Sequence, residues 1–569
     1  MTNKARQVVV VVAVFVIALA SLGTIIGLLV NTGQLSEYSD GFRYEVNGSK
    51  VTIVSYEGSD SDVVVPDKLK GHRVVGIAKD AFSTSASIVK SIKFNCTYSS
   101  FSIANEAFAK LTSLEKVVLP TNLKTISYGA FEGCTSLKSV IIPNSVTIIE
   151  DNAFKGCTSL NFIYSSDNYS TEGDNAIRNN ALYLPTSLLE IGASAFEDCS
   201  AIANAYISKD LEKIGEKAFN ECSNLTGLVV ADGSEITSIG DYAFYNTTIS
   251  SSVSTPLSFP NLVTIGAYAF GSVNTTYFTY MELPKTVTSI GEYAFTECDS
   301  LSKFVMAEDT KIETMGEGVF KGCTGLRNIT LPTDIKEIPA KTFMGCYRLL
   351  YGDNDFVIGK SVESIGDGAF ALYVGMGEKQ SPADFMRHVI TVDEENEHFA
   401  IIRLEDSRIE GNSNSTYRQG LLTDTNGTTI YAYYGSYDSK SYSPSTNGKT
   451  FRLLDVEGRT VQSVTTVKPY AFAGVKFDYI ELPVTIKGLG EYAFYKSHVT
   501  TFYTSAIDWE FTENTFEKLN LNLEEDKKLV GTYPEMEVLL LQSKEGVEAF
   551  LRKLGEFGIR AGTYSGDLS

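Results

Sequence analysis

Histidine is scarce in this chain, and the motifs of common enzyme sites are missing. Only four histidines occur among 569 residues, at His72, His388, His398 and His498. None stands in the H-E-x-x-H arrangement of zinc hydrolases, and there is neither a G-x-S-x-G nucleophile turn nor a phosphate-binding P-loop. We therefore expect a protein that is not an enzyme and that has no catalytic residue and no cofactor.

One acidic segment keeps an enzymatic alternative open. His388 and His398 flank the run DEENE, which begins at Asp393. Imidazoles and carboxylates in this order could gather a metal ion. A solvated acidic loop needs no metal, however, and we expect no metal site. An enzyme within residues 376–465 would require a pocket lined by His388, His398 and Asp393.

Positive charge is also in short supply. The chain has 48 lysines and arginines against 69 aspartates and glutamates, which gives a formal net charge of −21. Such a surface repels the phosphate backbone of nucleic acids and anionic lipid headgroups. We therefore expect no nucleic-acid partner, and solubility is the simplest role of the charge.

Long apolar runs are missing everywhere except at the N-terminus. Val8 to Val30 carries no charge and follows Lys4 and Arg6. A helix of this length crosses a hydrocarbon core of about 30 Å, whereas the apolar region of a cleaved signal usually has only about 7–15 residues. We expect residues 1–33 to be a signal anchor that contacts the membrane through residues 7–30. The charge bias then places the remainder outside the cell. Secretion after signal cleavage is the alternative.

A short motif recurs from residue 77 to residue 516. In Ile126-Ser-Tyr-Gly-Ala-Phe131, a bulky apolar residue is followed five positions later by phenylalanine, usually with alanine just before it. The period is mostly 22 to 27 residues, and self-similarity in this range indicates a solenoid. The phenylalanines of the copies are Phe82, Phe108, Phe131, Phe154, Phe196, Phe219, Phe244, Phe270, Phe295, Phe320, Phe343, Phe370, Phe472, Phe494 and Phe516.

Each copy also contains a strand pattern. Val140 and Ile142 are two residues apart, as one face of a strand requires, and Pro143 ends the strand because it lacks a donor. Phe154 then fills the core from the opposite side. We expect the strands of successive repeats to stack in parallel about 4.8 Å apart.

The combined pattern resembles a known family. The segments TSLKSVIIPNSVTIIEDNAFKGC (135–157) and GLRNITLPTDIKEIPAKTFMGC (325–346) carry it nearly in full. They resemble the BspA-type leucine-rich repeat, which is common in bacterial surface proteins and also occurs in some parasitic protists. The resemblance covers about 77–375 and 466–520. It implies a β-rich leucine-rich-repeat solenoid with stacked parallel strands on one face and short helical or irregular turns on the other. It also implies surface display, adhesion and no enzymatic activity.

The remaining segments divide the chain further. An Asn47-Gly48 turn between alternating apolar runs predicts a β-hairpin, so residues 34–76 are expected to form an N-terminal cap. Leucine-rich repeats follow at 77–375 and 466–520. Residues 376–465 form an irregular interruption that contains a hairpin around Asn426-Gly427, with a separately folded insertion as the alternative. Residues 521–569 are expected to be a strand–helix C-terminal cap.

Most of the eight cysteines recur in register with the repeats. They lie three residues after a repeat phenylalanine, and only Cys96 is off the pattern. Placement of one cysteine per repeat favours buried thiols, which pack as small apolar groups, over disulfides or a metal site. The cysteines in register are Cys134, Cys157, Cys199, Cys222, Cys298, Cys323 and Cys346.

The outward strand positions offer a candidate binding site. Three consecutive repeats place Tyr164, Tyr183 and Tyr206 there, and Phe162 adds a second column. Tyrosines are rigid, amphipathic and enriched at recognition sites, although they also simply favour strands. We predict a ligand-binding patch at these four residues. The expected function is adhesion or protein recognition by a membrane-anchored extracellular protein, and the alternative is a structural or spacer protein without a specific ligand.

Overall fold

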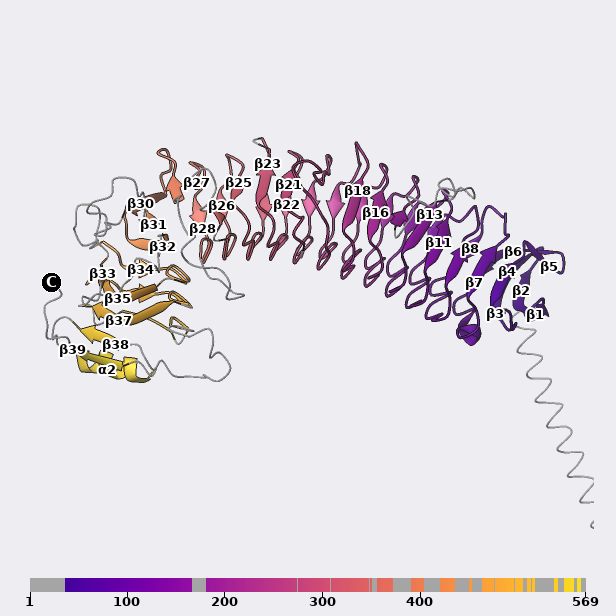
Figure 1. Ribbon diagram of the computed structural model, residues 1–569, viewed down its shortest axis with the longest axis horizontal. Helices are drawn as coiled ribbons and strands as arrows, with labels where there is room; N and C mark the ends of the chain where they lie inside the picture. Colours follow the sequence, from indigo (N-terminus) through magenta and orange to yellow (C-terminus); the bar gives the residue numbers. More distant parts are fainter. Residues whose placement is uncertain are drawn as a thin grey trace, which may run out of the picture. The chain divides into compact units, whose positions relative to one another are not determined.

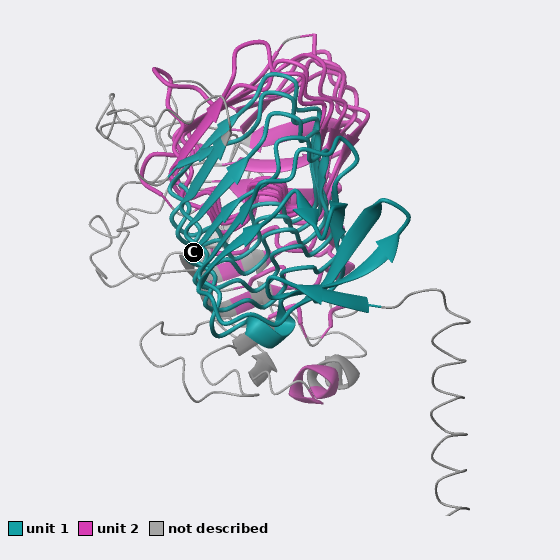
Figure 2. Cartoon of the chain, turned by 90° about the vertical axis from the view of Figure 1, so that its right-hand side faces the viewer, with its two compact units in different colours: residues 1–225 teal, residues 226–569 magenta. Residues whose placement is uncertain are grey.

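The computed structural model describes the repeats and both hairpins (Figure 1). The described residues are 36–165, 181–273, 275–307, 309–346, 348–349, 356–371, 390–403, 420–434, 450–452, 463–474, 476–495, 497–504, 509–512, 514–516, 537–540, 547–556 and 560–563. The expected signal anchor at residues 1–33 lies outside them. Within them, no helix is both long enough and apolar enough to span a bilayer. The chain divides into two compact units, residues 1–225 and 226–569 (Figure 2).

Unit 1 begins with a cap sheet and continues into two parallel sheets. The cap sheet contains β1 (Ser36–Ser39), β2 (Phe42–Asn47), β3 (Lys50–Tyr56), β5 (Lys68–Leu69), β6 (His72–Ile77) and β8 (Ser102–Ile103). The longer parallel strands are β4 (Asp62–Val65), β7 (Ser91–Phe94), β9 (Lys116–Val118), β11 (Ser139–Ile142), β13 (Phe162–Ser165), β14 (Ala181–Tyr183) and β16 (Asn204–Ile207). The shorter ones are β10 (Thr125–Ile126), β12 (Ile148–Ile149), β15 (Glu190–Ile191) and β17 (Lys213–Ile214). The 3-10 turn η1 spans Ser83–Ser85.

Unit 2 continues the same design. Its first repeats contain β18 (Gly227–Val230), β19 (Ser238–Ile239), β20 (Thr264–Ile265), β21 (Tyr280–Leu283), β22 (Ser289–Ile290), β23 (Lys303–Met306), β24 (Thr314–Met315), β25 (Asn328–Thr330), β26 (Glu337–Ile338), β27 (Phe356–Ile358), β28 (Ser364–Ile365) and β29 (Ile390–Val392). A hairpin sheet follows with β30 (Phe399–Arg403), β31 (Gly420–Asp424), β32 (Thr429–Tyr434), β34 (Thr466–Val467) and β36 (Gly488–Leu489). The last sheet holds β33 (Thr450–Arg452), β35 (Lys476–Leu482), β37 (His498–Thr504), β38 (Glu537–Leu540) and β39 (Arg560–Thr563), with helix α2 (Val547–Glu556) between the last two strands in sequence.

The core is the one that the repeat pattern predicts. Val140 pairs in parallel with Val117 on one side and with Ile163 on the other. All the repeat phenylalanines are buried, and they stack from one repeat to the next. The rings of Phe131 and Phe154, for example, are 5.3 Å apart and within 4° of parallel. Each repeat therefore buries its apolar face against its neighbours, as a solenoid must.

The turns around the repeat phenylalanines are irregular rather than helical. The residue two positions before the phenylalanine has positive φ in nearly every repeat, for example Asn152 (+57°) and Ser194 (+54°). This region disfavours non-glycine residues by about 1–2 kcal/mol each. Hydrogen bonds between repeats hold it: the amide of Asn152 donates to the carbonyl of Ala193 at 2.8 Å, and that of Phe154 to Ala195 at 2.8 Å.

The first hairpin forms as predicted, but its loop lies one residue further along the chain. Asn47 belongs to β2 and pairs with Lys50, which leaves Gly48 and Ser49 as the loop. Gly48 has φ of +62°, and Asn47 is not among the residues with positive φ. The prediction that Asn47 and Gly48 form the two-residue loop was therefore wrong by one residue. A loop with glycine at its first position also matches the twist of the strands.

The second hairpin, in the interruption, repeats the backbone arrangement of the first. Strand β3 pairs antiparallel with β2 and parallel with β6, while β32 pairs antiparallel with β31 and parallel with β34. After each hairpin the same backbone contact forms. The amide of Tyr56 donates to the carbonyl of Ala81 at 2.7 Å, and the amide of Tyr433 donates to that of Ala471 at 2.8 Å.

The side chains at these contacts correspond as well. Tyr56 stacks on Phe82 with ring centroids 5.5 Å apart, and Tyr433 stacks on Phe472 at 5.9 Å. Phe82 and Phe472 are the first repeat phenylalanines after their respective hairpins. Each hairpin thus covers the first repeat of the block that follows it, which would otherwise expose an apolar face.

Candidate functional site

The four predicted patch residues lie together on the outward face of unit 1. Phe162 and Tyr164 belong to β13, Tyr183 to β14 and Tyr206 to β16. The parallel register places Tyr183 beside Tyr206 and, one strand earlier, Tyr164 beside Tyr183. All four side chains are partly exposed. We call these four residues the aromatic patch.

The rings of the aromatic patch are nearly parallel to one another. Ring centroids are 6.0 Å apart for Phe162 and Tyr164, 6.5 Å for Tyr164 and Tyr183, and 4.4 Å for Tyr183 and Tyr206, with interplanar angles of 10° to 11°. Parallel rings only 4.4 Å apart must overlap face to face. Between Tyr183 and Tyr206, a partner therefore meets ring edges and hydroxyl groups rather than open ring faces.

The patch continues an uncharged part of the same sheet. Parallel pairing places Val118 beside Ile141 and Ile141 beside Tyr164, and both aliphatic side chains are partly exposed. In the adjacent outward column, Ser139 pairs with Phe162. From β11 to β16 these two columns carry no charged residue. Neutral, partly apolar surface of this extent contrasts with the net charge of −21, and such surfaces often mark interaction sites.

The corresponding sheet of unit 2 is different in chemistry. There the outward column consists of Glu282, Val305 and Thr330. The hydroxyl of Tyr280 donates a 2.6 Å hydrogen bond to Glu282, which together with burial raises the pKa of Tyr280 to about 12. The Nζ atom of Lys303 lies over the same ring, 5.6 Å from its centroid. The aromatic residue here is engaged by charges of both signs, so the uncharged column of unit 1 is not a general property of the repeat.

A second tyrosine stack, in unit 2, was missed by the sequence reasoning. Tyr242, Tyr268 and Tyr293 stack with centroids 4.8 and 5.0 Å apart. They occupy the positive-φ turn position, with φ of 55° to 56°. Burial, followed by a hydrogen bond to Glu317, raises the pKa of Tyr293. The signal that could have found this stack is the repeated tyrosine two residues before phenylalanine in DYAF, AYAF and EYAF.

The side chains of the acidic segment that the enzymatic alternative requires are engaged in local hydrogen bonds and an ion pair. The Asp393 carboxylate accepts a 2.9 Å hydrogen bond from the amide of Glu395, which itself pairs with Lys360 at 2.8 Å. The Asn396 side-chain oxygen accepts from the amide of His398 at 2.8 Å. His388 lies outside the described residues. In the part of the chain that the structure describes, no group of three or more histidine, cysteine or acidic side chains is arranged to hold a metal ion.

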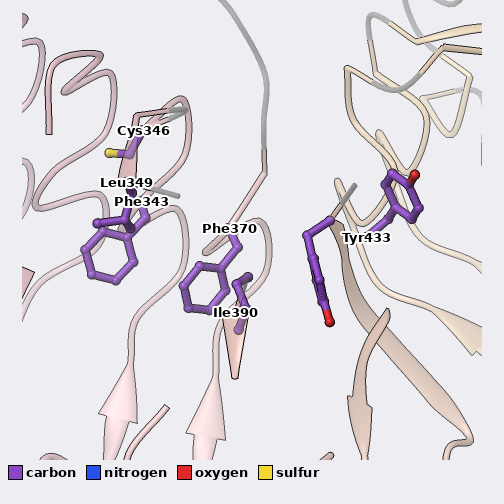
Figure 3. Close-up of a pocket in the computed structure, with 7 residues that line it drawn as sticks. Phe343, Cys346, Leu349, Phe370, Ile390 and Tyr433 are labelled. Carbon is purple, nitrogen blue, oxygen red and sulfur yellow. The ribbon is translucent and has the colours of Figure 1, made fainter. Parts of the chain in front are cut away.

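A small apolar pocket lies in unit 2 beside the second hairpin. Its lining residues include Phe343, Cys346, Phe370, Ile390 and Tyr433. Phe370 and Ile390 lie across from Tyr433 (Figure 3). The space open to a water-sized molecule is about 10 Å³. This is room for about one water molecule, whereas ligand pockets usually have volumes of about 300–1,000 Å³. The pocket is therefore a packing gap rather than a ligand site.

The eight cysteines are free thiols and all are buried. Each in-register thiol donates to the carbonyl of the preceding repeat phenylalanine, as Cys157 does to Phe131 at 3.1 Å and Cys323 to Phe295 at 3.0 Å. Burial raises the pKa of Cys134 to about 12. The prediction of buried thiols is confirmed, and each thiol links neighbouring repeats through its hydrogen bond.

The chain is similar to solved leucine-rich-repeat structures at low identity and matches the model of one repeat family. A leucine-rich-repeat protein from Bacteroides ovatus is 20% identical over 63% of this chain and all of its own, with a TM-score of 0.40. A leucine-rich cell-surface protein from Faecalibacterium prausnitzii is 19% identical over 59% of this chain and 86% of its own, with a TM-score of 0.33. A search of curated proteins found no match. The model of the BspA-type leucine-rich-repeat region matches residues 75–183, 180–259, 237–374 and 449–525, which is more than half of the chain. The chain therefore belongs to the BspA-type leucine-rich-repeat family.

Proposed function

We propose that this protein recognises a protein ligand at the cell surface through the aromatic patch. The observation that carries the proposal is the gathering of Phe162, Tyr164, Tyr183 and Tyr206 on an uncharged part of the unit 1 sheet. A solenoid holds such residues on a rigid frame, so that few degrees of freedom are lost on binding. Membership in the BspA-type leucine-rich-repeat family supports the same role, since surface display is what the resemblance to this family implies.

The proposal includes a membrane anchor at residues 7–30. Val8 to Val30 carries no charge and follows two basic residues, which supports a spanning helix with the repeats outside the cell. Protease added to intact cells should then remove the repeats while a short N-terminal fragment stays in the membrane. Release of the whole chain into the medium would favour the secreted alternative instead.

The recognition proposal is tested with a tyrosine variant and a matched control. Full-length protein carrying Tyr164→Ser, Tyr183→Ser and Tyr206→Ser is compared with one carrying Tyr242→Ser, Tyr268→Ser and Tyr293→Ser. Both variants remove three stacked tyrosines from a folded solenoid. We expect the first to lose binding to purified host matrix proteins or to other cells, and the second to keep it.

Equal binding by both variants, with unfolding curves that show intact folds, would rule out the aromatic patch as the ligand site. If the wild-type protein itself binds none of these materials, the spacer function without a ligand becomes the better account. Truncating an anchor residue at an interface typically costs about 2–4 kcal/mol, which is a loss of affinity that binding assays resolve easily.

A further inference from the structure

The outward face of unit 1 changes character along its length. The outward column that contains the patch tyrosines includes Lys93 of β7, which pairs with Val64 of β4 on one side and with Val118 of β9 on the other. The column of Phe162 contains Lys116 of β9, which pairs with Ser139 of β11. Both lysines are exposed and alternate along their strands with buried residues. Two lysines therefore precede the uncharged aromatic part of the face, and the terminal strand β4 adds Asp62 and Val64 to the same columns.

The two lysines are free to meet a partner. In the described part of the chain, neither Lys93 nor Lys116 forms an ion pair, whereas nearby Lys138 pairs with Glu115 at 2.7 Å. The other nearby carboxylate, Asp62, accepts a 2.6 Å hydrogen bond from Ser91 and a second one from Ser61. Asp62 and Glu115 are thus already engaged.

The local charge is opposite to that of the whole chain. The charged side chains around these strands include four lysines, Lys90, Lys93, Lys116 and Lys138, and two carboxylates, Asp62 and Glu115. The chain as a whole, by contrast, carries a net charge of −21. At physiological ionic strength the Debye length is about 8 Å, so a partner that approaches this face is influenced mainly by the local lysines. The local surface consequently attracts carboxylates even though the protein is acidic.

We propose that the ligand of this face is a protein segment with two chemically different ends. Its carboxylates lie over Lys93 and Lys116, and its apolar or aromatic side chains lie against the aromatic patch. This inference rests on the proposed function and adds to it the charge and the orientation of the partner. Strands stacked about 4.8 Å apart place Lys116 about 10 Å from Phe162 and Lys93 about 14 Å from Tyr164. A peptide of about five extended residues spans these distances.

Exposed lysines contribute more to the association rate and to partner choice than to affinity. Surface ion pairs add little to affinity, but complementary charge accelerates encounter and excludes partners of the wrong sign. The apolar contacts with the aromatic patch then limit dissociation. The lysines should therefore affect mainly the association rate and the aromatic patch mainly the dissociation rate, so binding kinetics can distinguish the two contributions.

The test uses a displayed library of random twelve-residue peptides selected on the full-length protein in detergent. We expect the wild-type protein to enrich peptides that carry acidic residues at one end and aromatic or aliphatic residues at the other. The variant with Lys93→Glu and Lys116→Glu should enrich peptides with basic residues instead. A control variant carries Lys124→Glu and Lys209→Glu, two exposed lysines outside these columns, and it changes the net charge equally. It should select the same peptides as wild type.

Kinetics on one selected acidic peptide separate this inference from the proposed function. Lys93→Glu with Lys116→Glu should slow association by about tenfold or more at low salt, with a smaller effect at high salt. The serine variant of the three patch tyrosines should mainly accelerate dissociation. Selection of neutral or basic peptides by wild type, or equal association rates in the two lysine variants, would overturn the inference while leaving the tyrosine result to decide the proposed function.

Two further outcomes also decide the question. Peptides that bind equally well to the tyrosine-to-serine variant, or no enrichment at all, would count against the proposed function itself. The last measurement is binding of the protein to vesicles of phosphatidylglycerol. If they bind the wild type and the tyrosine variant but not the Lys93→Glu, Lys116→Glu variant, the lysines recognise an anionic lipid surface, and the peptide inference is wrong.

Discussion

The hydroxyl of Ser497 donates a 2.6 Å hydrogen bond to the carbonyl oxygen of Phe472. Ser497 lies three residues after Phe494, which is the position that cysteine occupies in many other repeats. A hydroxyl thus takes the role that a thiol has elsewhere in the solenoid. The position requires a small buried donor that links two repeats, and it does not require sulfur as such.

Substitutions at Cys157 test this relationship. Cys157→Ser should keep the hydrogen bond to Phe131 and lower the free energy of unfolding by about 1 kcal/mol or less. Cys157→Ala removes the donor and leaves a small cavity, so it should cost about 1–2 kcal/mol. Urea unfolding followed by circular dichroism measures both. If the alanine variant is as stable as the serine variant, the hydrogen bond does not contribute to stability.

The buried thiols should make the protein sensitive to alkaline pH. Burial raises the pKa of Cys134 from its ordinary value of 9.0 to about 12, and burial likewise raises the pKa of Cys222. Above pH 9 the unfolded chain loses thiol protons that the folded chain keeps, so the free energy of unfolding falls as pH rises from about 9 towards 12. Unfolding curves across this range provide the measurement.

A variant with serine at Cys134 and Cys222 is the control for the pH effect. Its stability should fall less steeply between pH 9 and pH 11 than that of the wild type. In the native state at pH 8, the thiols should also fail to react with a disulfide reagent until the chain is unfolded. Rapid reaction of the native cysteines would contradict their burial.

Close stacking of the repeats makes certain glycines irreplaceable. A Cβ atom added at Gly215 would lie 2.6 Å from the carbonyl carbon of Gly192 in the preceding repeat, whereas one added at Gly359 would meet nothing within 4 Å. We expect Gly215→Ala to destabilise the protein by about 2 kcal/mol or more, because backbone must move. Gly359→Ala should be within about 0.5 kcal/mol of wild type. Similar unfolding midpoints for the two variants would show that the repeats can separate at little cost.

The two capping tyrosines should protect different parts of the chain. Tyr433 stacks on Phe472 and Tyr56 on Phe82, and replacement of a buried aromatic residue by alanine typically costs about 3–5 kcal/mol. Because each repeat contacts only its neighbours, Tyr433→Ala should increase amide hydrogen exchange in 463–495 and leave 91–142 unchanged. Tyr56→Ala should show the reverse pattern.

Hydrogen exchange measured by mass spectrometry reads both regions in one experiment. Loss of protection in both regions from either substitution would mean that the blocks unfold as one cooperative unit. In that case the second hairpin would not act as a cap for the repeats that follow it.

Much of the core followed from the sequence, whereas the hairpin loop and the stack of turn tyrosines did not. Val140, Ile142 and Phe154 are fully buried, as their spacing predicted, because strand periodicity and burial are local properties. The loop at Gly48 was misplaced by one residue, since its register depends on the pairing of Asn47 with Lys50 across two strands. The stack at Tyr268 was overlooked because a tyrosine at a positive-φ turn becomes part of a surface only when neighbouring repeats align.

The aromatic patch shows most clearly which features the sequence determines and which depend on the tertiary structure. The sequence by itself determined that Tyr164, Tyr183 and Tyr206 occupy equivalent outward positions, because a repeat with a constant core brings the same strand position to the same face. The tertiary structure decided the rest. It set the 4.4 Å distance between the ring centroids of Tyr183 and Tyr206 and placed Lys93 and Lys116 on the same face. Those distances depend on the register between strands far apart in the chain, which local spacing alone does not specify.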